Sequence, residues 1–138
     1  MKVKTEKWGY APIRNNPNDA GADLISPITV NLSPQSSVFI DFGVSIQLPK
    51  DTVGLVFARS GLGGKGVRPR NCVGVIDEKY YDNIGIMLEN VSTQQVTIDV
   101  GDRIAQLVVV PVIYENIELV DEFEKDGDRG GGFGSTGK

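Results

Sequence analysis

Histidine is absent from this sequence: there is none among its 138 residues. Without an imidazole the chain cannot form a Ser-His-Asp triad, and it lacks the ligands of most zinc sites. It has one cysteine, Cys72, which excludes an internal disulfide framework.

Long apolar runs are missing as well. No stretch approaches the length needed to span a bilayer, and residues 1–8 alternate charged and apolar side chains without the apolar core of a secretion signal. The formal net charge of −4 argues against a nucleic-acid-binding protein, which would carry a basic face. It does not exclude a triphosphate ligand, because local arginines decide that. We expect a cytoplasmic protein, or a nuclear one in a eukaryote, that binds neither membranes nor nucleic acids.

Helical periodicity is also missing, and short apolar segments separated by Gly, Pro, Asn and Asp turns predict an all-β sandwich, barrel or jelly roll. The length fits one domain. The expected strands are Val3–Trp8, Ala22–Ile25, Ile28–Leu32, Val38–Phe42, Val44–Leu48, Val53–Phe57, Cys72–Ile76, Ile84–Leu88, Gln95–Val100 and Ile104–Ile113. The last of these is almost continuously apolar, which predicts burial on both faces.

The composition changes near the C-terminus. From Asp121 onward charged residues and then glycines dominate, and such a segment has too little apolar surface to fold alone. We expect an all-β domain over residues 1–124 and a flexible arm over residues 125–138.

The stretch Asn71–Asn83 is the centre of the functional prediction. Cys72–Ile76 and Ile84–Leu88 read as the two strands of a β-hairpin joined by a polar turn. A glycine inside a strand, Gly74, marks close approach by a backbone or a ligand. With Asp77 and Tyr80 at its rim, such a site would suit a small planar ligand. The alternative is a plain hairpin in which Asp77 caps a turn, and this stretch alone favours that alternative.

Two further groups of polar residues stand at strand ends or inside apolar runs. Arg59 and Ser60 lie where a strand gives way to Gly61–Gly66, a loop or one helical turn, and a helix start with a hydroxyl and a guanidinium suits an anion. The alternative is a Ser60 N-cap with Arg59 paired to a surface acid. Gln106 interrupts an apolar run, so we expect it to face an interface or a ligand. Asp102 and Arg103 are predicted to form a structural turn and an ion pair.

The C-terminal residues 132–138 spell G-x-x-x-x-G-K, the pattern of a phosphate-binding loop. That loop requires a strand before it and a helix after it, and the sequence ends at Lys138, so we reject this interpretation. A glycine-rich segment can still wrap phosphates with its backbone N–H groups. Phe133, the one large apolar residue there, would suit stacking on a nucleobase.

Five stretches occur in an order that resembles the trimeric dUTPase family. They are Asp19–Leu24, Ala58–Leu62, Gly74–Tyr80, Gly101–Leu107 and Arg129–Gly137. The resemblance implies a distorted, β-clip-like jelly roll assembled as a homotrimer, with active sites that draw on three subunits. The sequence departs from the family at Ala58, where proline is usual, at Lys79, where an acid is usual, and at Tyr81-Asp82, where Arg-Gly is usual.

By the same resemblance, the chain would be a dUTP diphosphatase that converts dUTP and water into dUMP and pyrophosphate. Asp77 would activate the attacking water, and Tyr80 would pack on the deoxyribose. Mg²⁺ would arrive with the triphosphate and be reached by Asp23 through water, while Asp23 also holds Arg59. The resemblance assigns the other substrate contacts to Arg59, Ser60, Gly61, Asn71, Gly74, Val75, Ile76, Gln106, Arg129, Phe133, Gly134, Ser135 and Thr136.

Two other functions remain open at this stage. A deoxycytidine triphosphate deaminase shares the implied fold, but the arm motif and Gly-Val-Ile-Asp-x-x-Tyr favour the diphosphatase. A catalytically idle nucleotide sensor with a regulatory partner is the other, and the intact Asp77 weighs against it. The identity of any regulatory partner is not predicted.

Overall fold

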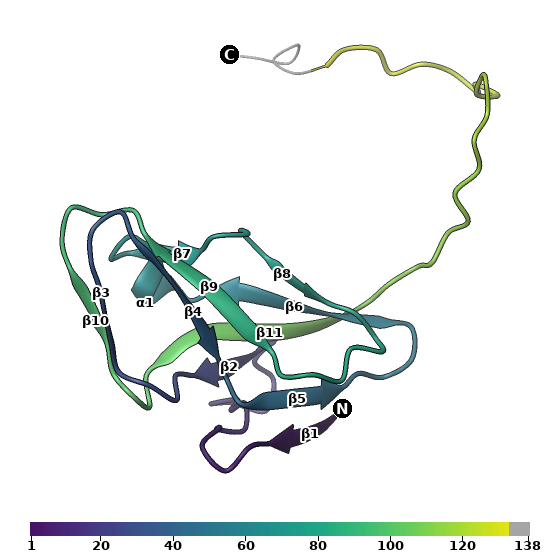
Figure 1. Cartoon of the computed structure of the whole chain (residues 1–138). Helices are drawn as coiled ribbons and strands as arrows, with labels where there is room; N and C mark the ends of the chain where they lie inside the picture. Colours follow the sequence, from purple (N-terminus) through teal and green to yellow (C-terminus); the bar gives the residue numbers. More distant parts are fainter. Residues whose placement is uncertain (133–138) are drawn as a thin grey trace.

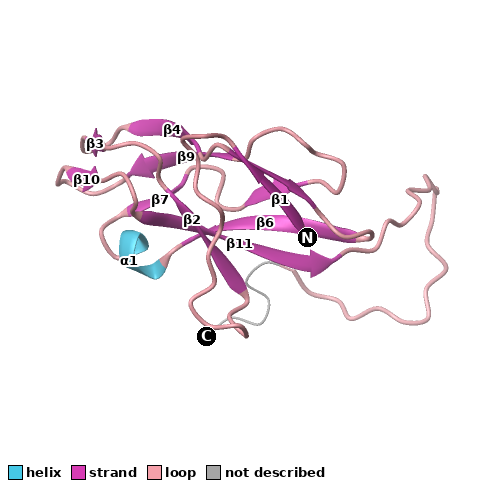
Figure 2. Cartoon of the chain, turned by 90° about the horizontal axis from the view of Figure 1, so that it is seen from below, coloured by secondary structure: helices cyan, strands magenta, loops and turns pink. Residues whose placement is uncertain are grey.

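The computed structural model describes residues 1–132, which form short strands and one single-turn helix (Figure 1). The strands are β1 (Lys2–Thr5), β2 (Gly21–Ile25), β3 (Val30–Leu32), β4 (Ser37–Asp41), β5 (Val44–Gln47), β6 (Thr52–Ala58), β7 (Val67–Pro69), β8 (Gly74–Ile76), β9 (Gly85–Asn90), β10 (Val96–Ile98) and β11 (Arg103–Pro111). The helix α1 spans Ser60–Gly63. The predicted all-β class is confirmed, as Figure 2 shows.

All strand pairs among the described residues are antiparallel. A four-stranded sheet has the order β2-β11-β6-β8, and a three-stranded sheet has the order β4-β9-β7. Two small sheets, β1-β5 and β10-β3, complete the body. The order of the largest sheet matters for the site, because it places β2 and β8 at opposite edges.

The core lies between these sheets and is built by alternation along each strand. In β9, for example, Ile86, Leu88 and Asn90 are buried while Met87 faces outward. Leu24, Ile40 and other core side chains come from several sheets and pack in one cluster, which Phe42 joins from the connection between β4 and β5. Full burial of each such side chain contributes about 1.5–3 kcal/mol, so the body needs no disulfide or metal.

The predicted central hairpin is wrong. β8 pairs with β6, with Gly74 opposite Val56, whereas β9 pairs with β4 and β7. The strand cannot begin at Cys72, because that residue has φ of 65°, in the left-handed region that breaks a strand. The segment after Ile76 therefore crosses from one sheet to another, and Asp77 leaves the edge of the four-stranded sheet rather than entering a hairpin turn.

The other expected strands are present with ends shifted by a few residues. β11 lies between β2 and β6, and Ile104, Ala105 and Leu107 are buried as predicted. Val108–Val110 are only half-buried, so burial on both faces holds for the first half of the strand.

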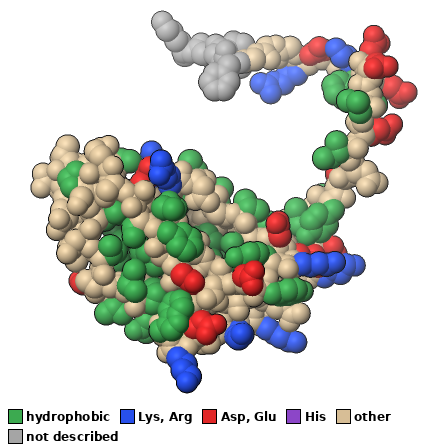
Figure 3. Space-filling model, in the orientation of Figure 1, with side chains coloured by type: hydrophobic (Ala, Val, Ile, Leu, Met, Phe, Trp, Pro, Cys, Tyr) green, Lys and Arg blue, Asp and Glu red, His purple; other side chains and the backbone are tan. Residues whose placement is uncertain are grey.

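After Pro111 the chain leaves the sheet, and residues 112–132 contain no strand or helix. They curve away from the body in Figure 1, and Figure 3 shows acidic and hydrophobic side chains exposed along them. The boundary at residue 124 and the compartment stay predictions. Within residues 1–132 no helix is long and apolar enough to cross a membrane.

Candidate active site

A cavity of about 290 Å³, here called the β8 pocket, lies beside the edge strand β8. Gly74 lies at the base of this pocket and leaves room because it has no side chain. A Cβ there would approach the Cβ of Val56 to 3.2 Å and the amide nitrogen of Asn71 to 3.8 Å. The pocket brings together six of the predicted residues, which are Asn71, Gly74, Val75, Ile76, Asp77 and Tyr80.

The rim of the β8 pocket is held by short-range hydrogen bonds. The backbone N–H of Tyr80 donates to the carbonyl of Asp77 at 3.0 Å, and the Tyr80 hydroxyl donates to the carbonyl of Asn83 at 3.0 Å. The Asn83 amide in turn donates to Asp41 at 3.4 Å. These contacts fix the phenol ring at the mouth of the cavity, while the side chain of Asp77 is exposed there.

A second cavity of about 340 Å³, here called the β2 pocket, lies beside the opposite edge strand. At its base the Asp23 carboxylate, whose side chain is 10% exposed, receives Arg59 Nε at 2.8 Å and Arg103 Nη1 at 3.3 Å. The expected pairing of Arg59 with Asp23 is confirmed. Two guanidiniums thus face the Asp23 carboxylate, while Asp19 adds a second carboxylate to the lining. The pocket therefore offers guanidinium N–H donors to an anion without a net positive charge.

The remaining lining of the β2 pocket is polar. Gln106 donates its amide to the carbonyl of Ala58 at 3.0 Å, and its Oε1 lies where a Cβ on Gly21 would be, so a larger residue at position 21 would displace the Gln106 side chain. Gln106 therefore faces a cavity, and its expected contact with a ligand or an interface stays a prediction.

The helical turn α1 begins at Ser60 with Arg59 as its N-cap and without a side-chain cap bond. The alternative interpretation of Ser60 as an N-cap is therefore wrong, and its exposed hydroxyl stands at the pocket. Gly61 lies next to it, in a neighbouring hollow formed with Lys65 and Arg103. The turn of Asp102 is structural as expected, since its carboxylate accepts the N–H of Asp99 at 2.9 Å.

The two pockets share no lining residue. The sheet order β2-β11-β6-β8 places two strands between the edge strands β2 and β8. The β2 pocket also takes Gln106 from β11, and Arg59 and Ser60 from the residues just after β6. With strands about 4.8 Å apart, the edge strands are separated by roughly 14 Å. In one chain, the residues predicted to hold the base and those predicted to hold the phosphates are thus two separate groups.

The described residues of the arm, 125–132, line neither pocket. Arg129 is exposed, and the Gly130 N–H donates to Asp128 at 2.8 Å. Phe133, Gly134, Ser135 and Thr136 lie outside the described residues.

Residues 1–132 contain no group of three or more Asp, Glu or Cys placed to hold a metal ion. Asp23 has both carboxylate oxygens engaged by arginines. Its surroundings therefore fit a contact to Mg²⁺ through water and not direct coordination.

Several residues of the pockets were not predicted. Phe39, Asn83 and Gly85 line the β8 pocket, and Asn15 and Asp19 line the β2 pocket. Asp19 belongs to one of the recognised motifs, so the sequence could have indicated it. Phe39 comes from β4, and its ring lies over Gly85, where a Cβ would collide with it. No local pattern predicts that contact.

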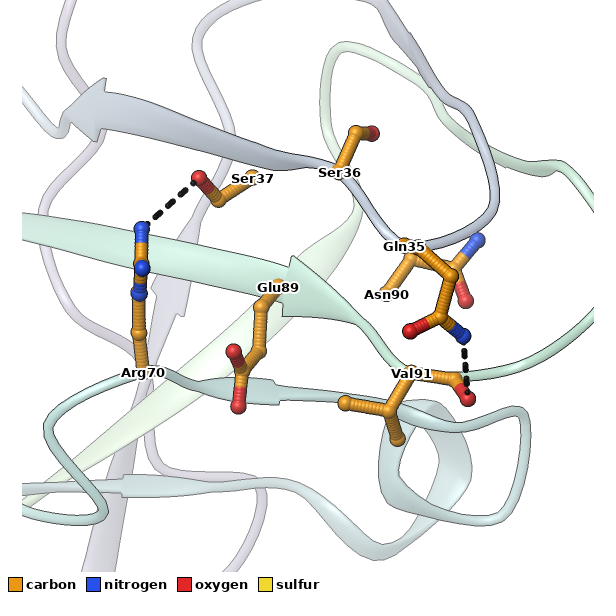
Figure 4. Close-up of a pocket in the computed structure, with 7 residues that line it drawn as sticks. All are labelled: Gln35, Ser36, Ser37, Arg70, Glu89, Asn90 and Val91. Atoms are coloured by element: carbon orange, nitrogen blue, oxygen red, sulfur yellow. Dashed lines mark hydrogen bonds between the residues drawn. The ribbon is translucent and has the colours of Figure 1, made fainter.

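A fourth hollow lies on the three-stranded sheet (Figure 4). Its polar groups largely satisfy one another: Gln35 donates to the carbonyl of Val91 at 3.0 Å, and Arg70 donates to Ser37 at 3.4 Å. Buried Asn90 donates to the carbonyls of Leu32 and Gln94. The network stabilises the end of the sheet and contains no predicted site residue.

Comparison with known proteins identifies this arrangement. A family model described as dUTPase matches residues 9–137. A deoxyuridine 5'-triphosphate nucleotidohydrolase of Cutibacterium acnes is 44% identical, over 88% of this chain and 81% of its own. A dUTPase of Staphylococcus bacteriophage 80alpha, solved with dUpNHpp, superimposes with a TM-score of 0.89 at 32% identity, covering 99% of this chain and 98% of that one. The dUTPase of phage phi11 of S. aureus, with a TM-score of 0.82 at 30% identity and coverage of 90% and 98%, has a structural Mg(II) ion.

The fold, the pockets and these matches define a nucleotide hydrolase on an all-β scaffold. Within that class the chain belongs to the dUTPase family. It is a hydrolase of dUTP, and the predicted family is confirmed.

Proposed function

We propose that this enzyme cleaves dUTP into dUMP and pyrophosphate by in-line attack of an Asp77-activated water on the α-phosphorus. The observation that carries the proposal is the position of Asp77. Its carboxylate is exposed at the rim of the β8 pocket, beside Tyr80, and has no hydrogen-bond or ion-pair partner among residues 1–132. A carboxylate that is free of partners can accept a proton from water as a general base.

The β8 pocket would take the base and the sugar. Its narrow floor at Gly74, with the backbone of Val75 and Ile76 and the amide of Asn71, offers donors and acceptors to the edge of uracil. The ring of Tyr80, held through Asn83, would pack on the deoxyribose and leave no room for a 2′-hydroxyl.

The β2 pocket would take the phosphates. Arg59 supplies positive charge, while Ser60, Gly61 and Gln106 supply donors around it. Mg²⁺, when bound with the triphosphate, neutralises charge on the phosphate oxygens, and Asp23 would contact it through water. Arg129, with Phe133, Gly134, Ser135 and Thr136, would close over the bound nucleotide.

One nucleotide needs both pockets, so we propose that each active site combines the β8 pocket of one chain with the β2 pocket of a neighbour in a homotrimer. The two pockets share no lining residue within one chain, which supports this. The segment after β11 supports it too, because Ile113, Ile117 and Leu119 are 80%, 101% and 98% exposed. Side chains of this size are not usually left in water in a row, and a second copy would cover them.

The protein should therefore sediment and scatter light as a trimer at micromolar concentration, with about three times the mass of the 14.9 kDa chain. Burial of the exposed apolar segment between copies is the physical reason. Light scattering coupled to gel filtration measures the mass directly. A particle with the mass of one chain contradicts the shared site.

The function itself is tested by comparing dUTP with dTTP, dCTP and UTP in the presence of Mg²⁺. Pyrophosphate release should be fast only with dUTP, because the β8 pocket is too narrow for the thymine methyl and Tyr80 rejects ribose. Ammonia released from dCTP would show a deaminase instead. Binding of dUTP without release of pyrophosphate would show a nucleotide sensor.

A further inference from the structure

Glu78, the residue after Asp77, makes contacts that the proposed reaction does not use. Its Oε2 accepts the backbone N–H of Asp51 at 3.0 Å and the hydroxyl of Tyr114 at 3.2 Å. Glu78 is half-buried, whereas its neighbours Asp77 and Lys79 are exposed. One carboxylate oxygen thus joins two segments distant in sequence to the loop at the rim of the β8 pocket.

The residue at the other end of this link, Asp51, is itself tightly held. It has φ of 58° in the turn between β5 and β6, an unusual conformation for a residue with a side chain. Its carbonyl accepts the N–H of Val112 at 3.0 Å, and the turn is closed by the Thr52 hydroxyl donating to Pro49 at 2.7 Å. The link therefore joins three segments, which are the Asp77 loop, this turn and the base of the arm at residues 112–114.

The contacts of Glu78 lie directly after Asp77 in the chain, so they restrict the position of Asp77. Pairing of β8 with β6 ends at Ile76, opposite Gly54, so Asp77 is the first residue beyond the sheet. The next contact outside the loop is the one made by Glu78. Asp77 is thus held between two fixed points. The bonds of Tyr80 close the loop on itself but do not tie it to the turn at Asp51.

Tyr114 is suited to be a lasting donor in this link. Its pKa is raised by desolvation, by the hydrogen bond to Glu78 and by the charges of Glu78, Asp51 and Asp77. The hydroxyl therefore stays protonated throughout the pH range in which the enzyme would work.

We propose that Glu78 is a positioning residue, which holds Asp77 at the mouth of the β8 pocket and links the Asp77 loop to the base of the arm. This inference rests on the proposed role of Asp77 as the base. In the proposed reaction Glu78 contacts neither the attacking water nor the substrate. It acts by restricting where the neighbouring carboxylate can lie, and small misplacements of a catalytic group are costly.

The test compares Glu78→Ala, Glu78→Gln and Tyr114→Phe, with Asp82→Ala as a matched control that removes an exposed carboxylate from the same loop. Glu78→Ala should lower kcat for dUTP by about tenfold or more and change KM by less than about threefold, because the base pocket is intact. Glu78→Gln should restore most of kcat, since an amide oxygen accepts the same two hydrogen bonds. Tyr114→Phe should give a smaller loss, and Asp82→Ala should leave kcat unchanged.

Hydrogen exchange at the Asp51 amide provides a readout independent of turnover. Its exchange should be faster in Glu78→Ala and return to the wild-type rate in Glu78→Gln. The proposal would be overturned if Glu78→Ala kept the wild-type kcat, or if Glu78→Gln lost as much kcat as Glu78→Ala. It would also be overturned if Glu78→Ala raised KM by the same factor as it lowered kcat. A wild-type enzyme that releases no pyrophosphate from dUTP would instead overturn the function proposed above, whatever the exchange at Asp51 shows.

Discussion

Asp77→Asn should lower kcat for dUTP by about 10²–10⁴-fold, the range that general bases contribute. Asparagine keeps the shape of the side chain but cannot accept a proton from water. Binding of a non-hydrolysable dUTP analogue should stay nearly unchanged, because the carboxylate acts on water and not on the substrate. Single-turnover kinetics and calorimetric titration with the analogue measure the two effects separately.

Asp82→Asn is the matched control for this experiment. It removes a carboxylate from the same loop, and Asp82 does not line the β8 pocket. Turnover close to normal in Asp77→Asn would refute the assignment. Loss of analogue binding together with turnover would make Asp77 a binding residue instead.

The class of fold was predictable because its cause is local. Alternation of apolar and polar residues marks each strand by itself, as in β9, where the buried Ile86 and Leu88 flank the outward-facing Met87. Glycine and proline then mark where strands stop. The body of the protein follows from these two signals.

Strand partners were not predictable in the same way. β8 and β9 are neighbours in sequence and both read as strands, yet they lie in different sheets. Nothing in the period-two pattern says which edge a strand will join, and the left-handed backbone at Cys72 has no signature in its residue type. Contacts between distant segments decide both.

In the candidate site, too, residues within a sequence motif were predictable, and residues brought in from distant segments were not. Six of the residues that the motifs indicated line the β8 pocket, whereas Asp19 lies in a recognised motif and lines the β2 pocket without having been predicted. Phe39, in contrast, reaches the β8 pocket from another sheet, and Glu78 gains its partners from residues far along the chain. The sequence alone also could not show that the two pockets share no lining residue within one chain.

Removal of the residues from Asp128 onward should cost turnover by orders of magnitude while the trimer and its melting temperature stay almost unchanged. Residues 126–132 are exposed and none belongs to the hydrophobic core, and both Lys125 and Gly130 contact Asp128 within the arm. The proposed closing of the arm expels water and brings Arg129 to the leaving phosphates. Loss of the arm should therefore lower turnover without lowering the stability of the fold.

Closing the arm requires a ligand that can offset its ordering. Fixing each residue costs roughly 1 kcal/mol or more of conformational entropy. Base stacking and phosphate contacts together can offset that cost, whereas dUMP lacks the outer phosphates. Proteolysis after Lys125 or Arg129 should be slowed by a triphosphate analogue and hardly by dUMP.

Mixing two inactive proteins shows whether the arm closes on its own chain or on a neighbour. Chains without the arm keep Asp77, and Asp77→Asn chains keep the arm. If each site takes Asp77 from one chain and the arm from another, trimers assembled from an equal mixture should recover about a quarter of wild-type turnover. Mixing after assembly, without exchange of chains, is the control and should recover no turnover.

If co-assembled trimers also stay inactive while each protein still forms trimers, the arm serves the chain that carries it. Full activity in the truncated protein alone would mean that the arm is not needed for catalysis.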